Sequence, residues 1–118
     1  MNLKNFLITL MSISLSEKSK KYVEKNKISK LFIDIKFFEE TCTQIYEPFI
    51  SIITNNDLKN WEKNEKVSMK NLTLYISDSF LKIFGKLDEY QLEIGGFLKK
   101  ILILTNVEPI IKNICKTN

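Results

Sequence analysis

Residues 28–53 read ISKLFIDIKFFEETCTQIYEPFISII, and the spacing of the apolar residues in this stretch decides the predicted fold. Apolar residues recur there at steps of three and four, as on one face of an α-helix. This face carries Ile28, Leu31, Phe32, Ile35, Phe38, Cys42, Ile45, Tyr46, Phe49 and Ile53. Residues 31–38 also alternate as a β-strand does, but the helical spacing explains more positions. We therefore predict a helix, kinked near residues 44–47 because Pro48 removes a backbone hydrogen bond.

A second apolar stretch with helical spacing covers residues 69–104. Its apolar face carries Met69, Leu72, Ile76, Phe80, Ile83, Leu87, Tyr90, Ile94, Phe97, Ile101 and Leu104. One continuous helix would indicate a coiled coil, whereas a break near Gly85 would give a helical hairpin with a capping box at residues 88–91. Each of the three glycines in this stretch would cost about 1 kcal/mol inside a helix relative to Ala. The hairpin is therefore the preferred interpretation.

The remaining segments predict shorter helices. Residues 2–13 have amphipathic spacing, Ser14 to Glu17 form a capping box for a basic helix over 15–26, and Thr105 to Glu108 form another before a closing helix. The predicted fold is thus all-α, a compact bundle of about five to six helices with a helical hairpin in the C-terminal half. A length of 118 residues suits one helical domain spanning 1–118.

The core of this bundle is predicted from the apolar faces. Its members are Phe32, Ile35, Cys42, Ile45, Phe49, Ile76, Phe80, Ile83, Ile94, Phe97 and Ile101.

The absence of His and Arg limits the chemistry that the chain can perform. All 18 basic residues are Lys, which a genome rich in A and T, such as that of a virus or mobile element, would favour. Without His, no side chain has an ordinary pKa near neutrality, and no Ser–His–Asp or Cys–His device can form. Glycine-rich nucleotide-binding motifs are also absent. We therefore predict that the chain is not an enzyme and has no catalytic residue and no cofactor.

The two cysteines, Cys42 and Cys115, lie 73 positions apart. With no CxxC motif and no His, a metal site is not expected. Each Cys falls on the apolar face of a predicted helix, so buried free thiols are predicted. A single disulfide is the alternative if the protein is exported.

The lysines are concentrated near the N-terminus. Residues 1–30 carry seven Lys against two Glu, whereas residues 31–65 have a net charge of −4. The predicted partner-binding residues are these lysines with the single tryptophan: Lys18, Lys20, Lys21, Lys25, Lys27, Lys30 and Trp61. A solvated helix face would carry the same lysines. Trp61 could either anchor its loop to the core or project as an interface anchor.

These features predict a protein–protein interaction module of the inhibitor, immunity or adaptor type, acting through its helical surface. The partner is then a macromolecule, a protein in the first instance, with a homodimer as an alternative arrangement. The alternative function is sequence-independent nucleic-acid binding, because lysines contact phosphates without reading bases.

The N-terminal residues bear on the location of the protein. Residues 1–16 imitate a short signal peptide, but the apolar run is interrupted by Thr and Ser and also suits an amphipathic helix. We predict a cytoplasmic protein, with export as the alternative. No stretch reaches the length of about 18 apolar residues that a membrane span requires.

Overall fold

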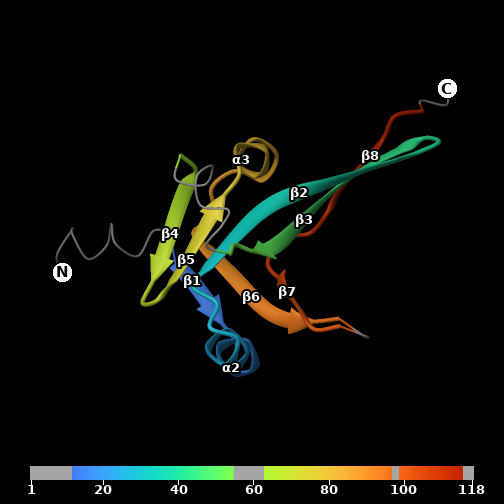
Figure 1. The fold of residues 1–118 in the computed structure, drawn as a ribbon. Helices are drawn as coiled ribbons and strands as arrows, with labels where there is room; N and C mark the ends of the chain where they lie inside the picture. The colour runs from blue at the N-terminus through green and yellow to red at the C-terminus, as the bar shows by residue number, and fades with distance from the viewer. Residues whose placement is uncertain (1–11, 55–62, 97–98, 116–118) are drawn as a thin grey trace.

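The computed structural model describes residues 12–54, 63–96 and 99–115, and most of these residues lie in β-strands (Figure 1). They form eight strands and two helices. The strands are β1 (Ser12–Leu15), β2 (Lys30–Glu40), β3 (Thr43–Ile52), β4 (Glu65–Met69), β5 (Leu72–Ile76), β6 (Glu89–Gly95), β7 (Ile101–Leu104) and β8 (Ile110–Asn113). The helices are α2 (Glu17–Lys25) and α3 (Asp78–Phe84).

The strands form two sheets. The larger sheet has the order β4-β5-β2-β3-β8, and the smaller one has the order β1-β6-β7. The pairs β2–β5 and β1–β6 are parallel, and the other pairs are antiparallel. In Figure 1 the β2–β3 hairpin is long, and its tip projects away from the rest of the described molecule with β8 beside it.

The all-α prediction is wrong, and the error begins in residues 28–53. That stretch folds as the β2–β3 hairpin, with a turn at Thr41 and Cys42. Leu31 and Ile33 are fully buried on one face of β2, while Phe32 is buried on the other face with Ile53 and Tyr75. Because a strand buried on both faces is apolar at consecutive positions, its sequence loses the strict alternation that identifies a strand.

Pro48 does not kink a helix but lies within β3. Its partner across the hairpin is Ile35, and the β8 pairing ends at Tyr46. At Pro48, β3 is therefore an edge strand of the described sheet, and edge positions are where proline is tolerated in sheets.

The stretch 69–104 is also not a helical hairpin. It contains the end of β4, then β5, α3, β6 and β7. Only the break at Gly85 is confirmed: α3 starts after the N-cap Ser77 and ends at Gly85, whose φ of 79° suits a glycine. The segment 88–91 enters β6 instead of capping a helix.

Of the three shorter helices predicted near the ends of the chain, one is confirmed. The basic helix predicted over 15–26 is confirmed as α2, although Ser16 rather than Ser14 caps it, accepting a hydrogen bond from the Ser19 amide. The closing helix is wrong because its residues form β8. Of the helix predicted over 2–13, residues 12 and 13 belong to β1, and the rest lies outside the described residues.

The main core lies between the two sheets, α2 and α3. Its fully buried apolar members are Leu31, Ile33, Leu74, Ile76, Phe80, Tyr90 and Leu92. Of the predicted core, Phe32, Ile76 and Phe80 are buried, and the half-buried members are Ile35, Cys42, Ile45, Phe49, Ile83 and Ile94. The prediction that Ile101 is a core residue is wrong, because its side chain is 48% exposed. Phe97 lies outside the described residues. Within the described residues, no helix is long and apolar enough to cross a membrane.

Replacing Phe80 with Ala should destabilise the fold by about 3–5 kcal/mol, since it would leave a cavity in the main core. Phe80 is fully buried, and its ring lies 4.9 Å from that of Phe84 and 6.4 Å from that of Tyr90, measured between centroids. Denaturant unfolding measures the change. The matched control is Phe38→Ala. Because the Phe38 side chain is 45% exposed, this variant should lose much less free energy of unfolding. Equal losses for the two variants would contradict this assignment of the core.

Tyr90 should make the protein sensitive to alkaline pH. Burial of the Tyr90 phenol raises its pKa above 10.0, and the nearby Glu65 adds to this, while a hydrogen bond from the Leu87 amide opposes it. The folded state therefore keeps this proton to higher pH than the unfolded state. The resulting stability is present below about pH 10 and is lost as pH rises through the folded-state pKa. Urea unfolding across this range should show a steeper decline for the natural protein than for Tyr90→Phe.

Candidate functional site

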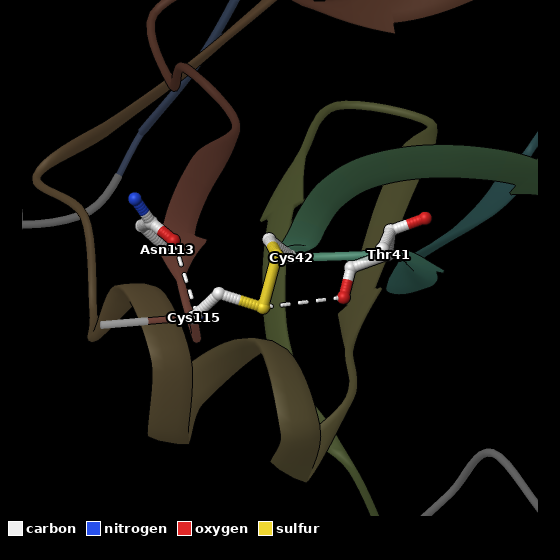
Figure 2. The surroundings of a disulfide bond; sticks show 4 residues. All are labelled: Thr41, Cys42, Asn113 and Cys115. Atoms are coloured by element: carbon white, nitrogen blue, oxygen red, sulfur yellow. Dashed lines mark hydrogen bonds between the residues drawn. A yellow bond between two sulfur atoms is a disulfide. The ribbon is translucent and has the colours of Figure 1, made fainter. Parts of the chain in front are cut away.

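The two cysteines form a disulfide at one end of the larger sheet. Cys42 lies in the β2–β3 turn and Cys115 follows β8, and their sulfur atoms are 2.11 Å apart (Figure 2). The predicted buried free thiols are therefore wrong, because both cysteines of the chain are paired. Both residues are half-buried.

Backbone contacts align the strand ends around this sulfur pair. The Ile114 amide donates to the Cys42 carbonyl at 2.8 Å, and the Cys115 amide donates to Oδ1 of Asn113 at 3.1 Å. Cys115 Sγ lies 3.5 Å from the Thr41 carbonyl oxygen, as Figure 2 shows. A disulfide sulfur has no proton to donate, so this contact can become a hydrogen bond only when Cys115 is a thiol.

Beside the sulfur pair lies a surface that we call the β arm, made of residues 37–46 and 110–113. Its three strands carry a row of apolar side chains on each face, because residues opposite one another in register point to the same side. One row is Phe37, Tyr46 and Ile110, and the other is Phe38, Ile45 and Ile111. Phe37 is 49% exposed and Ile111 is 67% exposed. Apolar rows exposed on both faces of a projecting sheet are typical of interaction surfaces.

Polar contacts on the β arm hold its aromatic side chains in place. The Phe37 and Tyr46 rings lie 5.1 Å apart, and the Lys112 ammonium lies 5.2 Å from the centre of the Tyr46 ring. Gln44 donates to the Glu39 carboxylate at 3.1 Å. These contacts join side chains of neighbouring positions on the arm's own strands.

The predicted lysine cluster is split by the fold. Lys18, Lys20, Lys21 and Lys25 lie on α2, Lys27 follows in a left-handed turn, and Lys30 begins β2. Lys18, Lys21 and Lys25 line one hollow, whereas Lys20 and Lys27 line a different one. Trp61 lies outside the described residues.

The acidic stretch does not neutralise these lysines within the described part of the chain. Glu39, Glu40 and Glu47 lie on or beside the β arm, and Lys20 pairs instead with Glu17 on its own helix, at 3.7 Å. The other ion pair among the described residues joins Lys86 to Glu65.

The described side chains form no cluster of candidate metal ligands. No group of three or more His, Cys, Asp or Glu side chains gathers among the described residues.

Comparison with known proteins identifies a similar fold but no sequence relative. No family model and no curated protein matches the sequence. The crystal structure of Escherichia coli SufA, involved in biosynthesis of iron–sulfur clusters, is similar over 80% of each chain, with a TM-score of 0.51 and 8% identity. The crystal structure of IscA with a [2Fe-2S] cluster is similar over 80% of this chain and 83% of that one, with a TM-score of 0.47 and 11% identity.

The likeness to SufA concerns the fold alone. The predicted interaction module acting through a helical surface is wrong because the described chain is mainly β. An inhibitor or adaptor acting through a helical surface would need a helical bundle. The described chain instead has two helices and two sheets, arranged as in a protein of iron–sulfur cluster biosynthesis.

Two features of the sequence were consistent with a disulfide, but the helical interpretation did not use them. The polar run Glu39 to Gln44 between two apolar segments suits a hairpin turn, which would have placed Cys42 at a strand end. An even number of cysteines was the second signal.

Reducing the disulfide should lower the free energy of unfolding by about 2–4 kcal/mol, because the bond closes a long loop in the unfolded chain. The two cysteines are 73 positions apart. Thermal unfolding with and without a dithiol reductant measures the change. The Cys42→Ser/Cys115→Ser double variant serves as the control and should not respond to the reductant. An equal response in this variant would show that the reductant acts elsewhere.

Proposed function

We propose that this chain, with Cys42 and Cys115 reduced, takes part in iron–sulfur cluster biosynthesis and offers these two thiolates to a cluster carried as cargo. The observation that carries the proposal is the meeting of the two cysteines of the chain, 73 residues apart in sequence, on a fold similar to that of SufA. SufA is described as involved in the same process.

The chemistry of the donor set requires the reduced form. Iron–sulfur clusters are held by cysteine thiolates, and neither sulfur of a disulfide is a thiolate. The oxidised pair therefore does not fit a cluster. A dithiol reductant breaks the Cys42–Cys115 bond by donating two electrons, and each sulfur then takes one proton or remains a thiolate while the reductant becomes a disulfide. The half-buried position of both residues leaves them open to this exchange.

Two thiolates from one chain are half of the usual set of four. A second copy would supply the other two, and the β arm lies directly beside the sulfur pair in each copy. The apolar rows of the arm, with Phe38 45% exposed and Ile111 67% exposed, offer the surface on which two copies could meet. We therefore include a homodimer in the proposal, with the arms in contact.

The same requirement supports a cytoplasmic location, where thiols are kept reduced. Export with cleavage after residue 16 would remove β1, whose Ile13 is buried in the main core. The chain then acts as a carrier and not as an enzyme, since binding cargo through thiolates needs no general acid or base.

Anaerobic reconstitution tests the proposal. The reduced protein is mixed with ferrous iron and sulfide, and the visible absorption of a cluster is followed together with the molecular mass by light scattering. Cluster absorption should accompany a mass of twice 13.9 kDa. Cys42→Ser and Cys115→Ser should each abolish both signals, while the neighbouring Thr43→Ser should retain them.

Two results would refute the carrier function. Absorption that survives in Cys42→Ser would mean that these thiolates do not hold the cargo. Absence of absorption in the reduced natural protein, with free thiols confirmed by titration, would mean that the chain does not bind clusters.

A further inference from the structure

A basic hollow lies between α2, the end of β6 and Lys100, and neither the disulfide nor the β arm contributes to it. Its volume is about 610 Å³, and it is lined by Lys18, Lys21, Tyr22, Lys25, Asn26, Ile94, Gly95, Gly96 and Lys100. This volume lies within the range of small-molecule sites, about 300–1,000 Å³.

The charge of the hollow is unbalanced. The described residues that line it include four lysines and no carboxylate. None of the four forms an ion pair within the described part of the chain, where Glu17 pairs with Lys20 instead. Four ammonium groups around one concavity repel each other, and an anion bound among them would relieve that repulsion.

The walls of the hollow are fixed by buried contacts. Ser19 of α2 is fully buried, and its hydroxyl donates to the Leu92 carbonyl of β6 at 3.1 Å. Val23, also on α2, is buried in the main core. At the end of β6, Gly96 has a φ of 102°, and a Cβ there would collide with the Lys99 carbonyl oxygen. The lysine-bearing helix and the glycine turn are therefore held at a set separation.

The floor of the hollow is partly apolar. Tyr22 and Ile94 are half-buried and line it together with the lysine stems. Asn26 is less available, because its amide nitrogen donates to the Tyr22 carbonyl at 2.8 Å. A ligand that matches this lining has a dense negative charge at one end and an apolar part at the other.

We propose that the basic hollow binds a phosphorylated organic small molecule. Its phosphates would contact Lys18, Lys21, Lys25 and Lys100, and its apolar part would lie against Tyr22 and Ile94. Lysine binds phosphate as a point charge, without the paired geometry that arginine offers to a carboxylate. A lysine-only site therefore favours the ligand with the highest local charge. A nucleic acid would instead need an extended basic groove that follows the backbone.

Calorimetric titration with two probes tests the proposal on the full chain. Adenosine triphosphate and inorganic tripolyphosphate carry the same number of phosphates, and only the first has an apolar part. Both should bind at one site per chain, and adenosine triphosphate should bind at least about threefold more tightly. Binding of both should weaken as salt is raised.

Matched variants locate the site. Lys21→Gln/Lys100→Gln should weaken adenosine triphosphate binding by about tenfold or more, because two of the four charges are lost. Lys20→Gln/Lys82→Gln removes the same net charge outside the hollow and should change binding by less than about twofold. Circular dichroism checks that both variants remain folded.

Three results would overturn the proposal. Equal weakening in the two variants would mean that only net charge attracts the probe. Tripolyphosphate binding as tightly as adenosine triphosphate would mean that no organic part is recognised. Tight binding of single-stranded DNA that tripolyphosphate cannot displace would assign the lysines to a nucleic acid.

Discussion

Strand β2 pairs with β3 over residues 31–40 and with β5 over residues 30–33. This double pairing places Leu31 and Ile33 in the main core and Phe32 in the second cluster on the opposite face. Strand β5, which is parallel to β2, is followed directly by α3. Phe80 of α3 packs in the main core near Tyr90 of β6, with ring centroids 6.4 Å apart. Strand β2 therefore joins the β4–β5 pair to the β3–β8 pair within the larger sheet. Its residues 37–40 lie beyond the β5 pairing and form part of the β arm.

Only features with local causes could be predicted from the sequence. The basic segment with a serine cap formed α2, Gly85 ended α3, and Phe32, Ile76 and Phe80 were buried. Strand pairing depends on residues far apart in sequence, and the local pattern does not encode it. In β2, burial on both faces made apolar residues consecutive. Their spacing then fitted a helix by chance. The consecutive Phe37 and Phe38 have another cause, because each belongs to a different exposed row of the arm.

The candidate site was hidden for the same reason. Cys42 and Cys115 meet only because β8 returns to pair with β3 beside the hairpin turn, with Ile45 opposite Ile111 and Thr43 opposite Asn113. The helical interpretation placed both cysteines on apolar helix faces, where they would be buried and unpaired. The lysines are concentrated in one basic segment of the sequence, but their division between two hollows depends on α2 packing against β6, where Ser19 bonds to Leu92.

The sulfur pair and the basic hollow lie in different parts of the molecule and depend on different chemistry. In Figure 1 the arm tip and α2 lie well apart. The disulfide joins the hairpin turn to the end of β8, and β8 pairs with β3 over only four residues. Four residues make a short edge strand, whose pairing is weak without further support. Reduction would remove this covalent link between the hairpin turn and β8 and free the two thiols, while the α2–β6 contact that shapes the basic hollow lies elsewhere in the fold. A change in the redox state of the sulfurs should thus alter the surface beside them and leave the anion site unchanged.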